Sequence, residues 1–326
     1  MNISCKKGKD EPLSEIINEI PSNEEISLKV PYGFPYPDVP ADNKPTQARI
    51  DLGEKLFFDP ILSRDNSVSC ASCHLPDRFF TDNLTVSIGI EGRKVERNSP
   101  TLINVAFQKS MFWDGGNPTL EQQVLAPIDN HNEFDFDVNE IVKRLQKHKD
   151  YSTLFQMAYK QAPSVYALVR AIANYERTLI GGTSKYDDYN RTMNSDVFSE
   201  SEYRGLSIFF GERGECFHCH GGFNFTDNSF QNNGLYLTYP DSGRARITQL
   251  PTDVGKFKVP SLRNVEMTAP YMHDGSISTL EEVVAHYVGG FKKHRNKSLI
   301  IQKLNLTTQE QSDLVNFLKT LTDKKK

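Results

Sequence analysis

Two copies of the motif Cys-x-x-Cys-His constrain this chain of 326 residues more than any other feature of its sequence. The residues that form them are Cys70, Cys73, His74, Cys216, Cys219 and His220. This spacing is the attachment signal of c-type haem, in which two thiols bind the vinyl groups and the adjacent histidine ligates the iron. The alternatives are a disulfide framework or zinc, but zinc needs four ligands per site and each motif offers three. The sequence therefore predicts two covalently bound haem c groups.

Composition and charge exclude two classes of protein. The formal net charge of −4 at pH 7 gives the chain no basic field, so nucleic acid is not an expected partner. Because no run of 18 apolar residues occurs, no segment is predicted to span a membrane. Haem is attached to Cys-x-x-Cys-His motifs outside the bacterial cytoplasm, and we therefore expect a periplasmic protein.

The fifth cysteine, Cys5, lies outside both motifs. A small residue, Ser4, precedes it and a charged, polar stretch follows, as at the mature start of a bacterial lipoprotein. This pattern predicts a lipid anchor at Cys5, and an unmodified thiol in a terminal segment is the alternative. Residues 1–45 are polar and then rich in proline, and we expect them to form a flexible tether.

Helical periodicity begins near Thr46, and no run of alternating strand residues stands out. Helices are predicted around Leu52–Phe57, Val138–Leu145, Val165–Leu179, Tyr203–Phe210 and Gln309–Leu321. The last two follow capping boxes that begin at Ser199 and Thr307. A mainly α fold is therefore expected.

Parts of the chain recur at a constant offset of 160 residues, as from Pro100 to Pro260. The blocks are 100–105 with 260–265, 113–115 with 273–275, and 119–124 with 279–284. This repeat predicts a duplicated c-type cytochrome domain with one haem in each copy. We expect the first domain to cover residues 46–182 and the second to cover residues 183–326.

The ligand opposite each proximal histidine decides what a haem does. A filled position makes an electron carrier, whereas an open one binds a small oxidant. In the second half the candidate ligands are Met272, His273, His286 and Tyr287. The residues 160 positions earlier are Phe112, Trp113, Ala126 and Pro127, none of which ligates iron. The first haem is therefore expected to be open, and only the second can take a ligand from this region.

From about Leu52 to Leu321 the chain resembles the bacterial di-haem cytochrome c peroxidases and the related MauG proteins. Both haem motifs carry the resemblance, together with the blocks 56–60 (Leu-Phe-Phe-Asp-Pro), 112–115 (Phe-Trp-Asp-Gly) and 269–275 (Ala-Pro-Tyr-Met-His-Asp-Gly). It implies that the first haem reacts with peroxide and that the second accepts and relays electrons. It also places the family's distal glutamine and glutamate on Gln123 and Glu133, and its inter-haem tryptophan on Trp113.

The same resemblance implies one calcium ion between the domains. Its ligands would be Asn98 and the backbone carbonyls near Val259 and Pro260. No calcium-binding loop is visible in the sequence itself, so this expectation rests on the resemblance alone.

The chain departs from many of these peroxidases at two positions. They close the first haem with a histidine shortly after the proximal one, but no histidine lies between His74 and His131 here. The first haem is therefore expected to be open without reductive activation. The family's methionine ligand to the second haem aligns with Tyr287, as in MauG, and Met272 is the second candidate. A phenolate ligand favours ferric iron, whereas methionine raises the potential.

Glu133 and Gln123 also suit peroxide chemistry on general grounds. Cleaving a peroxide bond needs a base that takes a proton from the near oxygen and returns it to the leaving one. Glu133 fits this role, and Gln123 can orient the peroxide. The residues 160 positions later are Val283 and Lys293, so the pair belongs to one half only. The alternative is that both side chains are merely solvated and that Trp113 fills the core.

Three functions are compatible with these features. The first is a peroxidase that reduces hydrogen peroxide to water with electrons from a small periplasmic cytochrome c or cupredoxin. The second is a MauG-like enzyme that uses peroxide to oxidise a partner protein or small molecule, and Tyr287 favours it. The third is a di-haem electron carrier without catalysis, against which the open first haem argues. We expect the peroxidase, because it is the broader class.

Overall fold

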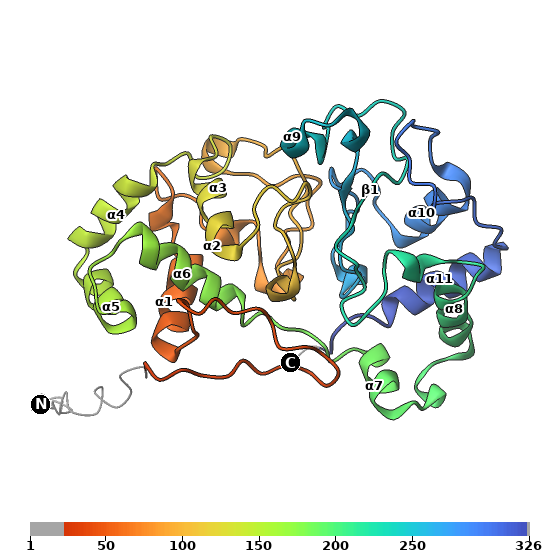
Figure 1. The fold of residues 1–326 in the computed structure, drawn as a ribbon, viewed down its shortest axis with the longest axis horizontal. Coiled ribbons are helices and arrows are strands. Elements are labelled where there is room, and N and C mark those ends of the chain that lie inside the picture. The colour runs from red at the N-terminus through yellow and green to blue at the C-terminus, as the bar shows by residue number, and fades with distance from the viewer. Residues whose placement is uncertain (1–22, 325–326) are drawn as a thin grey trace, which may run out of the picture.

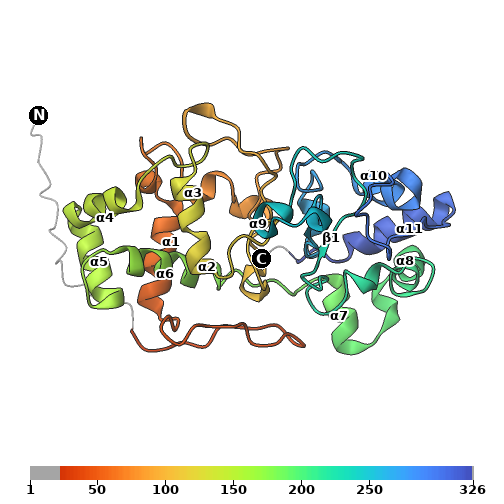
Figure 2. The ribbon, with the colours of Figure 1, turned by 45° about the horizontal axis from the view of Figure 1, so that its top comes forward.

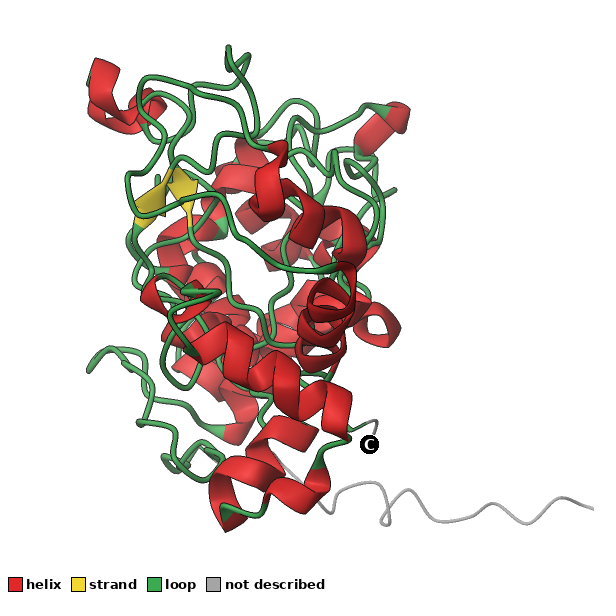
Figure 3. Cartoon of the chain, turned by 90° about the vertical axis from the view of Figure 1, so that its right-hand side faces the viewer, coloured by secondary structure: helices red, strands yellow, loops and turns green. Residues whose placement is uncertain are grey.

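A computed structural model describes residues 23–324 of the protein, which form two mainly helical halves lying side by side (Figure 1). The first half contains α1 (Gln47–Phe58), α2 (Leu120–Gln123), α3 (Leu125–Asp129), α4 (Val138–Lys147), α5 (Lys149–Tyr159) and α6 (Val165–Glu176). The second contains α7 (Lys185–Thr192), α8 (Glu200–Phe210), α9 (Ala245–Thr248), α10 (Leu280–Ala285) and α11 (Thr308–Lys319). Its short antiparallel strands β1 (Phe230–Gln231) and β2 (Phe257–Lys258) are the yellow pair in Figure 3. The predicted mainly α fold is confirmed.

Short turns of tighter or wider helix occupy much of the remaining chain. The 3₁₀ turns are Pro60–Leu62, Cys70–Ser72, Pro76–Arg78, Ile90–Gly92, Val105–Phe107, Ser195–Val197, Cys216–His218, Pro251–Asp253 and Val265–Met267. A π-helix, His286–Gly290, follows α10 directly. Both haem motifs therefore begin in a 3₁₀ turn within a loop, so their positions depend on the helices that pack around them.

The helix starts at the two capping boxes are confirmed. Ser199 and Thr307 each accept a hydrogen bond from the backbone three residues later, and the glutamate there bonds back to the cap. The predicted helix 165–179 instead ends at Glu176. The Leu179 carbonyl is used elsewhere, because it accepts a hydrogen bond from the Asn104 N–H at 2.7 Å.

In each half the first long helix crosses the last one at a glycine. A Cβ at Gly53 on α1 would lie 1.9 Å from the Ala171 carbonyl oxygen on α6. A Cβ at Gly205 on α8 would lie 2.0 Å from the Asp313 carbonyl oxygen on α11. The two helix pairs can approach this closely only because neither glycine carries a side chain.

Replacing Gly53 by Ala is therefore expected to lower the free energy of unfolding by about 1–3 kcal/mol, the usual cost of overpacking a core. Denaturant unfolding of the haem-loaded protein measures the change. Gly290→Ala is the control, because its Cβ would come no nearer than 3.5 Å to the Ala285 carbonyl oxygen. Equal losses in the two variants would contradict the close approach.

Each half has its own hydrophobic core. The first gathers the apolar faces of α1, α4, α5 and α6, and the predicted face of Leu52, Leu56 and Phe57 is buried in it. The second gathers α8, α10 and α11 around Phe209 and Phe317. The loop that carries the Cys-x-x-Cys-His motif of each half therefore packs against a separate helical core.

Local contacts recur at the offset found in the sequence. Asn104 and Asn264 are both left-handed, with φ of 63° and 60°, and their N–H groups donate to the carbonyls of Leu179 and Leu321. The Thr119 hydroxyl caps α2, and the Thr279 hydroxyl caps α10 in the same way. The repeated blocks thus adopt matching local structure.

The segment 23–45, red in Figures 1 and 2, contains no helix but is packed along both halves. Asn43 is fully buried, and its amide donates to Glu121 Oε1 at 2.8 Å in the first half. The Phe34 ring packs against Phe223 of the second half, with centroids 4.8 Å apart. This part of the expected tether is therefore held against the protein rather than free.

Cys5, the expected site of a lipid anchor, lies outside the described residues. The anchor therefore stays a prediction. Across residues 23–324, none of the helices has the length and apolar character needed to cross a membrane.

Candidate active site

The two Cys-x-x-Cys-His motifs present their histidines in the same way. The His74 N–H donates to the Cys70 carbonyl at 3.0 Å, and the His220 N–H donates to the Cys216 carbonyl at 2.8 Å. Each turn thereby brings the histidine back beside its cysteines. The two pairs of thiols and both imidazoles line one cavity.

The ring nitrogens show which atom of each histidine is available. His74 Nδ1 lies 2.9 Å from the Phe80 carbonyl oxygen, and His220 Nδ1 lies 3.1 Å from the Phe225 carbonyl oxygen. An Nδ1–H donated to a carbonyl fixes the tautomer and leaves the Nε2 lone pair free for a metal. Burial lowers the pKa of both histidines, which keeps the rings neutral as a ligand requires.

The cavity has a volume of about 790 Å³ and is lined by residues of both halves. Apolar side chains form most of its wall, among them Leu62 and Val124 in the first half and Leu280 and Leu314 in the second. Paired thiols, an imidazole with a free Nε2 and apolar walls are the groups that hold a covalent haem. The residues present therefore fit one haem at each motif. When bound, each haem would supply an iron that can bind a small oxidant or exchange electrons.

Gln123 and Glu133 both line the cavity in the first half, as the sequence predicts. Gln123 is the last residue of α2. Glu133 lies in the turn after α3, where the Glu133 N–H donates to the Asn130 carbonyl at 2.9 Å. Glu133 Oε1 accepts a hydrogen bond from the Asn130 amide at 2.7 Å. Burial raises the pKa of Glu133, although the Asn130 amide partly opposes this. The carboxyl can therefore hold a proton at a higher pH than an exposed glutamate.

Histidines other than the proximal pair are poor ligand candidates. His131 is exposed and does not line the cavity, and its Nδ1 lies 3.2 Å from Asp135 Oδ1. His286 is buried with Nε2 3.0 Å from the Asn233 carbonyl. His273 lines the cavity but stacks on Phe257, with ring centroids 3.7 Å apart. Among the first-half residues within 23–324 that line the cavity, His74 is therefore the only histidine.

Tyr287 and Met272 both line the cavity in the second half. Tyr287 lies in the π-helix, where burial raises its pKa to about 12 while the Asn233 amide opposes the rise. Met272 Sδ accepts a hydrogen bond from the same Asn233 amide at 3.3 Å. Pro127 lines the cavity 160 residues before Tyr287, so the first half has no donor at the matching position. Tyr287 and Met272 therefore both remain candidate ligands for the haem of the second half.

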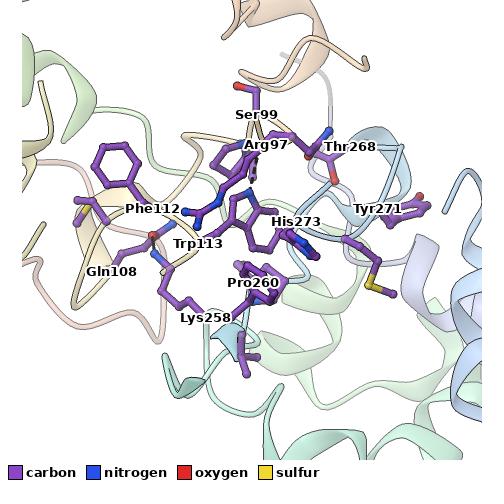
Figure 4. A pocket seen from close by; sticks show the side chains of 18 of the residues that line it. Arg97, Ser99, Gln108, Phe112, Trp113, Lys258, Pro260, Thr268, Tyr271 and His273 are labelled. Atoms are coloured by element: carbon purple, nitrogen blue, oxygen red, sulfur yellow. Dashed lines mark hydrogen bonds between the residues drawn. The ribbon is translucent and has the colours of Figure 1, made fainter. Parts of the chain in front are cut away.

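Trp113 lies where the two halves meet. Figure 4 shows its ring between Gln108 and Phe112 on one side and Pro260 and His273 on the other. Its indole Nε1–H donates to the Asn98 carbonyl at 2.9 Å, and its own carbonyl accepts from the Lys258 N–H at 2.7 Å. The ring is therefore held by a bond within the first half, and the backbone by a bond from the second.

The residues expected to hold calcium lie at the same junction. The Asn98 amide donates to the Leu84 carbonyl at 2.8 Å, and the Val259 carbonyl accepts from the Thr226 hydroxyl at 2.6 Å. Pro260 lines the cavity. In the described part of the chain, no cluster of three or more His, Cys, Asp or Glu side chains could hold a metal ion. The calcium ion stays a prediction.

Two buried charged residues of the cavity wall, Lys258 and Glu176, are absent from the sequence-based expectations. Lys258 is 7% exposed, and its ammonium donates to the Ser110 carbonyl at 2.5 Å and to Gln108 Oε1. Burial lowers the pKa of Lys258 to about 8. Glu176, at the end of α6, is 4% exposed. No motif marks either residue, because their burial depends on packing between segments far apart in the chain.

Comparison with known proteins agrees with this arrangement. Residues 47–195 match the family described as di-haem cytochrome c peroxidase. The chain is 35% identical to the methylamine utilization protein MauG of Methylophilus methylotrophus over 297 residues, which cover 88% of this chain and 87% of that protein. It is 33% identical to cytochrome c551 peroxidase of Nitrosomonas europaea over 313 residues, covering 91% and 90%.

Solved structures show the same fold. A MauG-like protein associated with microbial copper homeostasis superposes with a TM-score of 0.85 at 38% identity, covering 90% of this chain and 95% of that one. The diheme peroxidase BthA from Burkholderia thailandensis E264 shares the fold, with a TM-score of 0.73 at 23% identity over 90% of this chain and 94% of that one. The chain therefore belongs to the family of di-haem cytochrome c peroxidases and MauG proteins, enzymes of the oxidoreductase class.

Proposed function

We propose that the protein is a periplasmic di-haem peroxidase that reduces hydrogen peroxide to water with electrons from a small cytochrome c or cupredoxin. One observation carries the proposal. The first-half residues that line the cavity include Gln123 and Glu133, and among those within 23–324 the only histidine is His74. A metal position without a second histidine, next to an acid–base group, suits a reactive haem rather than an electron carrier.

We also propose that the halves arose by duplication and hold one haem each, with domains over residues 46–182 and 183–326. The recurrence of the Asn104 and Asn264 contacts supports this division, as does the presence of one haem motif in each half. The segment 23–45 packs on both halves and belongs to neither core.

The residues of the first cavity then have distinct roles. Reduction of one peroxide molecule to two waters consumes two electrons and two protons. Glu133 takes a proton from the near oxygen at its carboxylate and returns it to the leaving oxygen. Gln123 orients the peroxide through its amide. Trp113, bonded to both halves, lies on the route for electrons between the two haem sites.

A MauG-like oxidation of a partner protein or small molecule is the second candidate. Tyr287 favours it, because a phenolate ligand would stabilise ferric iron in the second half and disfavour reduction by an ordinary cytochrome. The two candidates share the first cavity and differ in where the electrons come from. Steady-state assays with reduced cytochrome c as the donor separate them, because the peroxidase consumes that donor.

The resting, fully oxidised protein is expected to show one high-spin and one low-spin ferric haem. The high-spin signal follows from the open first site, and the low-spin signal from a second site that Tyr287 or Met272 can complete. Electron paramagnetic resonance of the oxidised protein measures both. Two low-spin signals would contradict the proposal, since they would require a ligand opposite His74.

A further inference from the structure

Glu176 is a buried carboxyl to which peroxide chemistry assigns no role. It lines the cavity in the first half, and its charge acts on the Cys70 thiol, one of the two haem attachment points there. One of its oxygens, Oε2, is buried without a hydrogen-bond partner in the described part of the chain. An ionised carboxylate in such a place is unfavourable unless positive charge is near.

The second half shows that the fold does not need a carboxyl here. The glycine crossings align Ala171 of α6 with Asp313 of α11, and this register places Leu318 opposite Glu176. Leu318 also lines the cavity and belongs to the second core. One half therefore has an apolar contact where the other has an ionisable group.

The charged neighbours of Glu176 leave it unpaired. Arg177, the next residue, forms its ion pair with Glu121 of α2 at 2.8 Å instead. Burial raises the pKa of Glu176 to about 8; the Arg177 charge lowers it and the Glu121 charge raises it.

The charges of the other titratable groups that face α6 act on Glu176 only weakly. Burial raises the pKa of Tyr175, so this phenol is neutral near pH 7, and Glu54 of α1 is exposed to solvent. Cys70 becomes an uncharged thioether once haem is attached. The largest change of charge beside Glu176 would then come from the iron at His74, which differs by one unit between its oxidation states.

We propose that Glu176 is a proton-binding residue coupled to the first haem. Its carboxylate would take up one proton from the bulk solvent, forming one O–H bond, when a ferric iron held by His74 gained one electron from the donor. Oxidation reverses both changes. The inference rests on the proposed function only in requiring a haem at His74. Glu176 would supply one proton beside the site where the reduction of peroxide consumes two protons.

The sign of the coupling follows from electrostatics. Positive charge on the oxidised iron stabilises the carboxylate, so Glu176 binds its proton more weakly in the oxidised protein than in the reduced one. Between these two proton affinities, the potential of the first haem falls as pH rises. The limiting slope is about 59 mV per pH unit for a one-electron couple.

Spectroelectrochemical titration of the haem-loaded protein at several pH values tests the proposal. In the wild type, the potential of the high-spin haem is expected to fall with pH over the range in which Glu176 titrates, and in Glu176→Gln the slope over that range is expected to vanish. Glu54→Gln, an exposed carboxyl on α1, is the matched control and should keep the slope. Glu133→Gln should also keep it. A slope that survives in Glu176→Gln, that is lost in Glu133→Gln, or that is absent from the wild type overturns the proposal.

A second readout identifies the proton directly. The reduced-minus-oxidised infrared spectrum should contain a protonated-carboxyl band that is absent in Glu176→Gln. If that variant does not fold, Glu176→Leu copies the packing of Leu318 and should likewise lack the band and the slope. Retention of the band in either folded variant overturns the proposal. Absence of peroxide turnover would overturn the peroxidase function but leave both readouts interpretable.

Discussion

Replacing Glu133 by Gln is expected to slow peroxide turnover by a factor of about 10²–10⁴, the contribution of a lost acid–base group. Gln cannot accept and return the proton, yet it can keep the packing and a hydrogen bond with Asn130. Both haem groups should stay attached with unchanged resting spectra. Stopped-flow measurement of the reaction with hydrogen peroxide gives the rate. Glu140→Gln, an exposed carboxyl on α4, is the control and should react like the wild type.

The pH dependence of the same reaction gives an independent check. Glu133 acts as a base only when ionised, and burial raises its pKa above the ordinary value for a glutamate. The rate should therefore fall as pH decreases through this raised pKa, and the acid limb should disappear in Glu133→Gln. An unchanged rate and an unchanged acid limb in the variant would mean that Glu133 is structural and that protons reach peroxide by another route.

The features that sequence reasoning predicts here are those encoded over short distances. The capping boxes at Ser199 and Thr307 form because each cap and its glutamate are three residues apart. The position in the first half that corresponds to Tyr287 could be checked within the chain itself, because the repeat of 160 residues places Pro127 there. Gln123 and Glu133 were placed by resemblance to a family, and they do line one cavity.

Features that depend on tertiary packing were not predicted. Asn43 lies in a segment whose composition indicates a flexible tether. It is nevertheless fully buried, and its amide donates a hydrogen bond to Glu121, 78 residues away. Glu176 and Lys258 look like ordinary surface charges in the sequence, and only packing places them in the cavity wall. The π-helix that presents Tyr287 also has no sequence signal. In each case, the partner that changes the residue's environment comes from a distant part of the chain.

Replacing Tyr287 by Met is expected to raise the potential of the second haem substantially, since axial ligands set haem potentials over a range of about 0.8 V. The tyrosine phenolate favours ferric iron, whereas the methionine thioether favours reduction. The variant should then oxidise reduced cytochrome c faster at a given peroxide concentration. Spectroelectrochemistry of the low-spin haem measures the potential. Tyr271→Phe is the control, because Tyr271 lines the same half of the cavity while its hydroxyl donates to the Val265 carbonyl at 3.0 Å.

The same measurements separate Tyr287 from Met272. Both reach the second site, and the Asn233 amide contacts both side chains, so position alone leaves two candidates. Met272→Leu should keep the low-spin signal and the low potential if Tyr287 is the ligand. If Met272→Leu loses that signal while the Tyr287 variant keeps its spectrum and potential, the tyrosine assignment is wrong. The second haem would then be poised for reduction by a cytochrome, and the preference for MauG-like chemistry that Tyr287 provides would disappear.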